Sequence, residues 1–260
     1  MNRRSAALLL GLIVLSLPAS ARFISLQTTI TASVGAKTAA INFSAVNKGD
    51  EPAHNIWSEL VVFGRTYSNN NRTVLPPSEK YLARYTIPLA GQKGSYPLLL
   101  TIHYTDGNQY PFSALTAAPL IIGREPPAAL WGVVKPAAFT KDGEIEVALK
   151  NMTRQTQTIG LALFLPQELN TDLKPAKIDL SPGSNRTIKI KLSNFSALPG
   201  SSYQLFIIAQ TDGESGHTTA IIPGNVKIEK GSMLWINPAW LIGLLAGLGA
   251  VFIAAQFYKK

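Results

Sequence analysis

The sequence of 260 residues contains no cysteine. Disulfide bonds are therefore excluded, and an exported protein without them has to be stabilised by its hydrophobic core. A lipid anchor on an amino-terminal cysteine is excluded for the same reason. Charged residues are also scarce, at 15% of the chain. The 24 Lys and Arg outnumber the 15 Asp and Glu, but they are scattered and form no long block, so no nucleic acid is expected as a partner.

Residue types and motifs that carry catalysis are equally sparse. The three histidines are His54, His103 and His217, and no two are close enough in sequence to form a metal-binding motif. The sequence has no HExxH, GxSxG or DxDxDG motif and no glycine-rich phosphate loop. We therefore predict that the protein is not an enzyme and has no catalytic residue, cofactor or metal site.

Two apolar segments lie near the two ends of the chain. The first, residues 6–17, follows Arg3 and Arg4 and precedes the small residues Ala19 and Ala21. A basic start, a short apolar core and a small-x-small site are typical of a secretory signal peptide. We predict a signal peptide over residues 1–21 and a mature protein that begins at Arg22.

The second apolar segment predicts a single transmembrane helix over residues 234–258. No charged residue occurs between Lys230 and Lys259, and the apolar run approaches the roughly 20 residues that a bilayer requires. Residues 259–260 form a basic tail that should stay in the cytoplasm. We expect a single-pass protein of the cytoplasmic (inner) membrane with its ectodomain outside. A removable sorting tail has the same outline, but no LPxTG-like motif precedes it, so retention is preferred.

The membrane segment also carries a candidate helix-pairing motif. Gly243 and Gly247 are four residues apart, and small residues at this spacing let two membrane helices approach closely. Oligomerisation through this helix is one expectation, whereas a glycine-rich anchor without specific pairing is the other.

Between the apolar segments the sequence predicts an all-β fold in two copies. Apolar and polar residues alternate, with turn residues every 8 to 12 positions, as in β-sandwiches. The segment from Ile41 to Asn47 matches the segment from Ile145 to Asn151, and Gly94-Ser95-Tyr96 matches the segment that ends at Tyr203. We predict two tandem Ig-like β-sandwiches over residues 22–123 and 129–230, joined by a proline-rich linker at 124–128.

Charge patterning predicts a strand pair in the second copy. Residues 144–150 and 187–192 each place apolar side chains on one face and charged side chains on the other. The charges are opposite, with Glu144 and Glu146 on one strand and Lys189 and Lys191 on the other. Facing opposite charges stabilise a strand pair, so we expect neighbours with a structural role.

Two segments of the ectodomain resemble known Ig-like families. The pattern Leu198-Pro199-Gly200-x-x-Tyr203 followed by alternating apolar residues resembles the tyrosine-corner strand of fibronectin type III and other Ig-like domains. The run from Val46 to Asp50, with Pro52-Ala53, resembles the bacterial cell-adhesion-related (CARDB-type) module. The resemblance implies a spacer, adhesion or assembly module on a cell envelope. It also implies that Tyr96 and Tyr203 close matching corners of the two copies.

A candidate binding surface lies in the first copy. The strand pattern places Trp57, Val61 and Phe63 on the outward face, and the tyrosine-rich segment adds Tyr81 and Tyr85. An outward Trp beside aliphatic residues could stack on a sugar ring or contact a partner protein. The alternative is that Trp57 points inward, like the core tryptophan of Ig domains.

These observations predict an envelope protein that presents two Ig-like modules for protein–protein interaction or for surface or secretion assembly. The binding surface is expected on the first copy, which we place farther from the membrane because the anchor follows the second. Two alternatives are a carbohydrate-binding module with a glycan partner and an accessory subunit of an envelope enzyme. A row of exposed aromatic rings on one sheet would favour sugar, and a flat aliphatic patch would favour protein.

Overall fold

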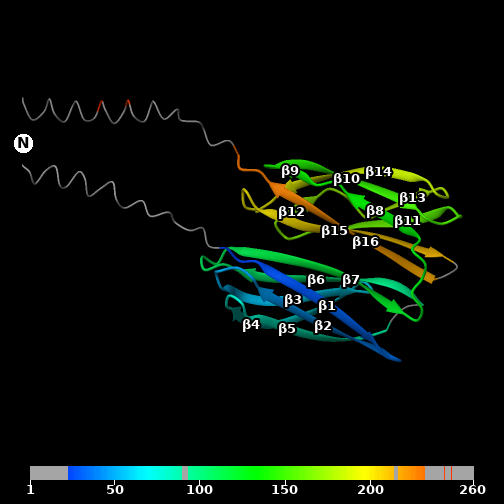
Figure 1. Cartoon of the computed structure of the whole chain (residues 1–260), viewed down its shortest axis with the longest axis horizontal. Helices are drawn as coiled ribbons and strands as arrows, with labels where there is room; N and C mark the ends of the chain where they lie inside the picture. The colour runs from blue at the N-terminus through cyan, green and yellow to red at the C-terminus, as the bar shows by residue number, and fades with distance from the viewer. Residues whose placement is uncertain (1–22, 90–92, 214–215, 232–242, 244–246, 248–260) are drawn as a thin grey trace, which may run out of the picture.

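The computed structural model describes residues 23–89, 93–213 and 216–231, together with Gly243 and Gly247 (Figure 1). The predicted signal peptide at 1–21 lies outside the described residues, as does the predicted membrane helix at 234–258 apart from these two glycines. Among the described residues no helix has the length and apolar character to cross a membrane. The regular elements that these residues form between 23 and 231 are β-strands, which confirms the all-β prediction.

Two groups of strands follow one another along the chain. The first half of the molecule contains β1 Leu26–Val34, β2 Thr38–Asn47, β3 Ala53–Val62, β4 Arg65–Leu75, β5 Lys80–Pro88, β6 Gly94–Thr105 and β7 Pro111–Ile122. The second half contains β8 Leu130–Val134, β9 Ala137–Phe139, β10 Asp142–Asn151, β11 Gln157–Phe164, β12 Leu169–Thr171, β13 Ala176–Leu180, β14 Asn185–Asn194, β15 Ser202–Gly213 and β16 Gly216–Ile228.

The two halves repeat one strand order. In the first half, a sheet of order β1-β2-β5 faces strands β4, β3, β6 and β7, which pair in that order. In the second half, β8, β10 and β14 pair in the corresponding order and face β13, β11, β15 and β16. Two antiparallel sheets packed face to face form the Ig-like sandwich, so the structure supports Ig-like halves. The second half adds β12 beside β14 and the short β9, which pairs parallel with β16.

Each half has its own hydrophobic core. The first core contains Ile41, Phe43, Ile56, Leu60 and Leu100 among its buried residues, whereas the second contains Ile145, Val147, Leu149, Leu205 and Ile207. Every second side chain of these strands points into a core, which matches the alternation of apolar and polar residues in the sequence, because successive side chains of a strand point to opposite faces.

A buried asparagine occupies the same position in each half. Asn47 ends β2 and Asn151 ends β10, and both side chains are 0% exposed. The Asn47 amide donates to the carbonyl oxygens of Glu51 (2.8 Å) and Leu75 (3.1 Å). The Asn151 amide likewise donates to the carbonyl oxygens of Gln155 (2.8 Å) and Leu180 (2.9 Å). The sequence repeat therefore corresponds to the same hydrogen-bonded asparagine in both halves, which joins two loops.

The predicted tyrosine corner is present in the second half, and the matching tyrosine of the first half contacts the other half. Tyr203 is 8% exposed, and its hydroxyl accepts a hydrogen bond from the Leu198 backbone N–H at 2.9 Å. Tyr96 is only half-buried, and its ring stacks on His217 of the second half with centroids 4.4 Å apart. Tyr96 lies at the start of β6, which has the place in the first half that β15 has in the second, and it also packs on the first core.

The predicted charge pairing in the second half is confirmed. β10 pairs antiparallel with β14, which places Glu144 opposite Lys191 and Glu146 opposite Lys189. The Lys189 ammonium lies 3.1 Å from Glu144 and 3.8 Å from Glu146. Lys135 also pairs with Glu146 from the segment after β8, and this partner is the main reason that the pKa of Glu146 is lowered. These charges stabilise a sheet face.

The halves lie side by side along their long axes, and the described chain begins and ends at one end of the molecule (Figure 1). Phe23 and Ser201 line the same cavity at this end, and Ser201 bonds to Ile228 close to the end of the described chain. The first half is therefore not stacked beyond the second. This corrects the end-to-end arrangement on which our expectation of a membrane-distal first copy depended.

Candidate functional site

Trp57 points outward from the first core, which is one of the two orientations that the sequence left open, and one face of its ring is covered. Its neighbours Ile56 and Ser58 on β3 are buried, whereas Trp57, Glu59 and Val61 share the opposite, outer face and are half-buried. The Trp57 ring stacks on His103 of β6 with centroids 4.1 Å apart and an interplanar angle of 15°. Because His103 covers one ring face, Trp57 offers a partner only its other face and its edges.

Tyr81 and Tyr85 are not surface residues, which corrects the predicted binding patch. Both are 6% exposed, and their hydroxyls share the buried Ser58 hydroxyl at 3.2 and 2.6 Å. The cause is the alternation along β5, where every second residue starting at Tyr81 faces the core. Burial raises the pKa of Tyr85 to about 12, and the hydrogen bond from Ser58 opposes part of this rise.

Phe63 is half-buried against the first core and is not part of a surface patch with Trp57. It lies in the turn after β3 with a positive φ of 50° and packs on the first core. The rings of Phe63 and Tyr96 form a T-shaped pair with centroids 4.9 Å apart, and Tyr96 in turn stacks on His217. The five predicted surface residues therefore do not form one continuous surface.

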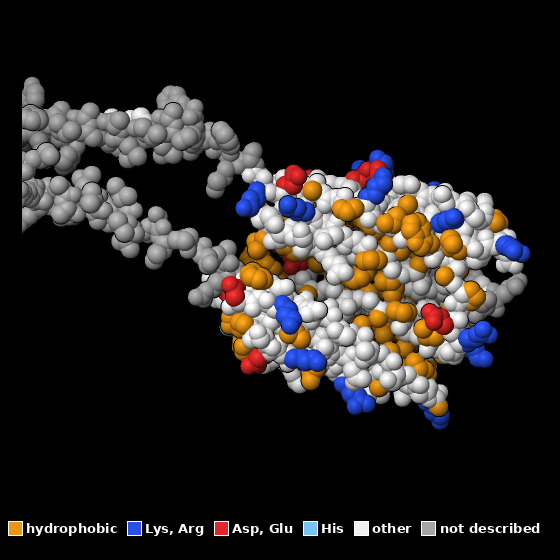
Figure 2. Space-filling model, viewed as in Figure 1, with side chains coloured by type: hydrophobic (Ala, Val, Ile, Leu, Met, Phe, Trp, Pro, Cys, Tyr) orange, Lys and Arg blue, Asp and Glu red, His pale blue; other side chains and the backbone are white. Residues whose placement is uncertain are grey.

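The outer faces of the two larger sheets pack against each other through a third, smaller core. Leu115 of β7, with Phe206 and Ile208 of β15, form its buried centre, and Leu99 and Phe164 pack beside them. We call this contact between the halves the seam. In the space-filling view, hydrophobic side chains gather right of centre in a patch that extends from one half to the other (Figure 2). Phe206 and Ile208 face away from the second core, yet they are covered because β7 packs over them.

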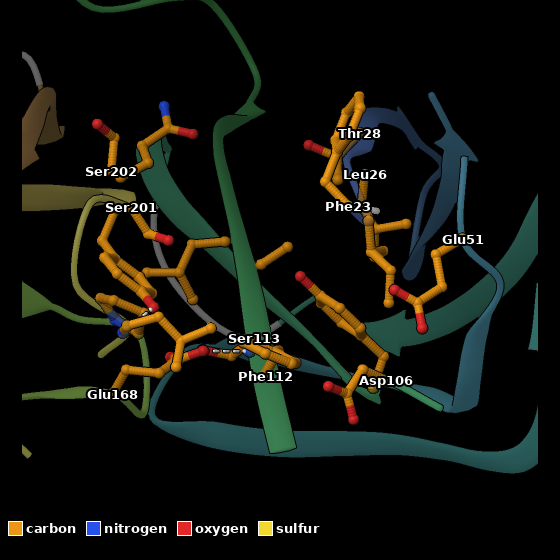
Figure 3. A pocket seen from close by; sticks show the side chains of 18 residues that line it. Phe23, Leu26, Thr28, Glu51, Asp106, Phe112, Ser113, Glu168, Ser201 and Ser202 are labelled. Atoms are coloured by element: carbon orange, nitrogen blue, oxygen red, sulfur yellow. Dashed lines mark hydrogen bonds between the residues drawn. The ribbon is translucent and has the colours of Figure 1, made fainter. Parts of the chain in front are cut away.

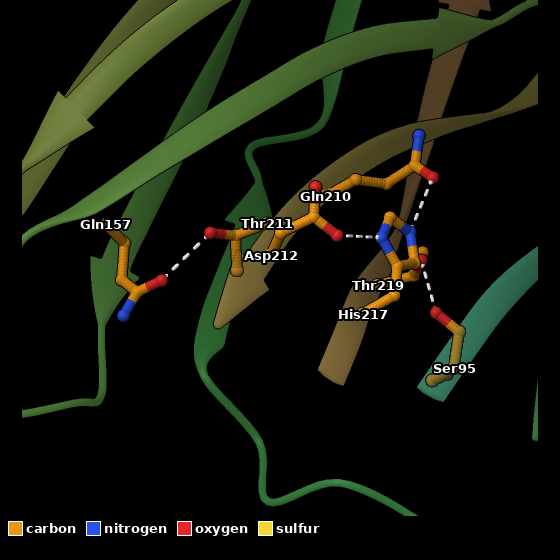
Figure 4. Close-up of polar contacts among 7 residues, drawn as sticks. All are labelled: Ser95, Gln157, Gln210, Thr211, Asp212, His217 and Thr219. Atoms are coloured by element: carbon orange, nitrogen blue, oxygen red, sulfur yellow. Dashed lines mark hydrogen bonds and ion pairs between the residues drawn. The ribbon is translucent and has the colours of Figure 1, made fainter. Parts of the chain in front are cut away.

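Polar contacts flank this apolar centre. At one end, the Thr219 hydroxyl donates to the Ser95 carbonyl oxygen at 2.8 Å, and His217 Nδ1 lies 2.8 Å from Asp212 Oδ1 (Figure 4). One parallel bridge between Gly94 and His217 joins the larger sheets here into a nine-stranded sheet. At the other end, the Tyr110 hydroxyl donates to the Ser196 carbonyl oxygen at 2.6 Å.

Glu168 makes the most buried polar contact of the seam. It lies between β11 and β12, is 0% exposed, and reaches across to Ser113 of β7. One carboxylate oxygen accepts the Ser113 backbone N–H and the other accepts the Ser113 hydroxyl, each at 2.7 Å. The same hydroxyl accepts the Gln167 backbone N–H at 2.9 Å. This network fixes the relative position of the halves.

A cavity of about 440 Å³ opens between the halves beside Glu168. We call it the cleft; its walls include Phe23, Glu51, Tyr104, Asp106 and Phe112 of the first half and Glu168, Leu198, Ser201, Tyr203 and Gln204 of the second. Figure 3 shows Glu51 and Asp106 on one side and Ser201 and Ser202 on the other, with the Ser113–Glu168 hydrogen bonds nearby. In Figure 2 a hollow at the end of the seam nearest the chain ends contains an acidic side chain.

The cleft is electrostatically negative. Burial raises the pKa of Tyr104 well above its ordinary value, and the nearby negative charge of Glu168 raises it further. Burial also raises the pKa of Tyr203, with a smaller contribution from the same carboxylate. Both phenols are therefore neutral at physiological pH, and they line a site whose charge comes from carboxylates.

The described residues contain no group of three or more His, Cys, Asp or Glu side chains that could hold a metal ion. His103 Nε2 is buried without a hydrogen bond, 3.5 Å from Glu59 Oε2 and beside Trp57. Sequence reasoning identified Trp57 but missed Ser113, Tyr104 and Glu168. Nothing in the local pattern singles these out, because their importance depends on how the two halves pack.

Comparisons with known proteins give no family. No family model and no curated protein matches the chain. Several solved structures resemble it weakly. Alpha-2-macroglobulin of Escherichia coli, activated by porcine elastase, matches with a TM-score of 0.31 and 13% identity over 81% of this chain. Red sea bream transglutaminase matches with a TM-score of 0.28 and 12% identity over 80% of this chain.

The chain spans 22% of the length of the macroglobulin and 31% of that of the transglutaminase. A protein of unknown function from Porphyromonas gingivalis W83 matches over 98% of its own length and 76% of this chain, with a TM-score of 0.29 and 10% identity. These scores are too low to place the chain in any of these families. The resemblance to CARDB-type modules stays a prediction.

Proposed function

We propose that the protein is a non-enzymatic binding protein of the cell envelope, held by its carboxy-terminal membrane helix, that takes part of a partner protein into the cleft. The cleft itself carries the proposal, because both halves build its walls and the seam fixes their separation. Its volume lies within the range of about 300–1,000 Å³ that is usual for ligand sites. Export and membrane retention are inferred from the sequence, and the proposed location outside the cytoplasmic membrane follows from them.

The exposed aromatic residues favour a protein partner over a glycan. Phe23, Trp131 and Phe195 are 55%, 53% and 73% exposed. They come from the start of the described chain, from β8 and from the loop after β14, so these three do not line up on one sheet face. A row on one face is what the carbohydrate-binding alternative requires.

Site-specific photo-crosslinking in the envelope of the host tests this function. A photoreactive residue at Gln204, which is exposed and lines the cleft, should give a defined adduct with an envelope protein. The matched control is Thr187, which is exposed on β14 outside the cleft lining. Equal adducts from the two positions, or none from Gln204, would contradict the proposal.

A further inference from the structure

The charged side chains that line the cleft are all acidic, whereas the chain as a whole is basic. Three carboxylates, those of Glu51, Asp106 and Glu168, are among its lining residues, and no Lys, Arg or His is. The whole chain has the opposite balance, with 24 basic and 15 acidic residues and a net charge of +9. A negative cavity in a basic protein attracts cations and repels anions at close range.

None of these carboxylates forms an ion pair with a described residue. Elsewhere in that part of the chain the carboxylates of Glu59, Glu144, Glu146 and Asp212 lie next to a Lys or His. In the cleft, Asp106 accepts the backbone N–H groups of Asn108 and Tyr110, each at 2.9 Å, and Glu51 accepts that of Gly107 at 3.4 Å. These bonds orient the two side chains and leave their negative charge uncompensated.

Glu168 would act on a ligand in the cleft through its negative charge and not by touching it. Its side chain is 0% exposed, so a ligand in the cleft meets its charge across the wall. A buried carboxylate that lacks a cationic partner is costly to desolvate, and a cation bound nearby lowers this cost. Glu168 and Tyr104 line the same cavity, and the charge of Glu168 adds to the rise that burial causes in the pKa of Tyr104.

Aromatic rings and a free hydroxyl complete the chemistry of the cleft. Tyr104 and Phe112 stack with centroids 5.6 Å apart, and Tyr203 and Phe23 line the same cavity. The Tyr104 hydroxyl makes no hydrogen bond to any residue that the structure describes, and the residue is half-buried. Ring faces attract ammonium and guanidinium groups, and a phenol oxygen accepts their hydrogen bonds.

We propose that the cleft binds an ammonium or guanidinium group, with the carboxylates of Glu51 and Asp106 as direct acceptors and the rings of Tyr104 and Phe112 as an aromatic wall. The inference rests on the proposed function, since it names the chemistry that the cleft would recognise in a partner. A lysine or arginine side chain of a protein and a free small amine share this chemistry.

Isothermal titration calorimetry of the full chain in detergent micelles tests the charge preference. The probes are Nα-acetylarginine amide, its neutral isostere Nα-acetylcitrulline amide, and a short glycine-rich peptide with one central arginine. We expect either arginine probe to bind at least about tenfold more tightly than the citrulline compound, which corresponds to about 1.4 kcal/mol. If the peptide binds and Nα-acetylarginine amide does not, the ligand of the cleft is an arginine or lysine side chain of a protein. If Nα-acetylarginine amide also binds, free small molecules can occupy the cleft as well.

Variants locate the binding in the cleft. Glu51→Gln and Asp106→Asn keep the size of each side chain and its hydrogen-bond acceptor but remove the charge, and each should weaken binding of the arginine probes at least about fivefold. Glu79→Gln removes a carboxylate that is exposed outside the cleft lining and should leave the affinity unchanged. Equal affinity for the arginine and citrulline probes, or the same loss in all three variants, would overturn the inference. No binding of any arginine probe would also overturn it. Adducts from Gln204 would still support the proposed function in each case.

Discussion

Single buried hydroxyl groups already make the stability of this fold depend on pH. Tyr85 has its pKa raised to about 12 from an ordinary value near 10, because burial disfavours the phenolate. The folded state therefore holds this proton more tightly than the unfolded chain does. The stabilisation is fully present below about pH 10 and is lost as the pH rises toward 12.

We predict that Tyr85→Phe reduces this alkaline loss of stability. At about pH 8 the variant should be roughly 1 kcal/mol less stable than wild type, because it loses the 2.6 Å hydrogen bond to Ser58. Between about pH 8 and pH 11 its free energy of unfolding should fall less than that of wild type. Urea titrations at the two pH values measure both effects, and an equal fall in both proteins would contradict the prediction.

The buried asparagines give a second prediction at this scale. Asn151→Ala should cost about 3 kcal/mol, because the carbonyl oxygens of Leu180 and Gln155 lose their partner in a buried loop. Asn47→Ala should cost a similar amount in the first half. Asn170→Ala, an exposed asparagine on β12, should change stability by less than about 0.5 kcal/mol. Chemical denaturation measures all three, and a cost for Asn151 no larger than for Asn170 would show that the shared network is not structural.

The matching tyrosines of β6 and β15 have different neighbours. Tyr203 begins β15 and bonds to the Leu198 backbone N–H, whereas Tyr96 at the start of β6 stacks on the other half. We predict that Tyr203→Ala costs about 3 kcal/mol or more by forming a cavity, and that Tyr203→Phe costs about 1 kcal/mol. Thermal unfolding measures both. Equal costs for Phe and Ala would mean that the hydroxyl, and not the ring, closes the corner.

The strands could be predicted from the sequence because their information is local. The alternation at residues 144–150, together with opposite charges on its partner, was sufficient to predict the pairing of β10 with β14. The same alternation along β5 puts Tyr81 and Tyr85 on the face opposite the charged residues Lys80 and Arg84, and this is the face that is buried. We placed both tyrosines on the surface from their residue type alone and did not apply the alternation of strand side chains to this segment.

The turn after β6 shows how a side chain can change the geometry that a local sequence favours. Asp106-Gly107 follows β6, which pairs with β7. The positive φ in that loop belongs to Gln109, at 64°, because the Asp106 carboxylate accepts the Asn108 and Tyr110 N–H groups and extends the turn. Side-chain hydrogen bonds of this kind compete with the two-residue turn that an Asp-Gly pair favours.

At the scale of the whole molecule, the seam was beyond sequence reasoning. The pattern of β15 shows that Phe206 and Ile208 point away from the second core, but it cannot show that β7 covers them. Glu168 gains its role only through this packing, and so does the cleft. A local alternation indicates a face, whereas the identity of what covers that face is a long-range property of the chain.

The seam should make the two halves unfold together, and this gives our last prediction. Ile208 is 1% exposed at the centre of the seam, so Ile208→Glu would place an unpaired charge there at a cost of about 3 kcal/mol or more. Calorimetry of the full chain should show one cooperative transition for wild type and two for this variant. The linker at 124–128 should also become more sensitive to protease, because separation of the halves exposes it.

Leu82→Glu provides the matched control, since Leu82 is 66% exposed on β5 and outside the seam. It introduces the same charge and should keep a single transition near the wild-type temperature. Two transitions in the wild type would mean that Glu168, Ser113 and the apolar contacts hold the halves too weakly to couple them. One transition in Ile208→Glu at a lower temperature would mean that coupling runs through the Gly94–His217 bridge. In either case the walls of the cleft would owe their spacing to something other than the buried centre of the seam.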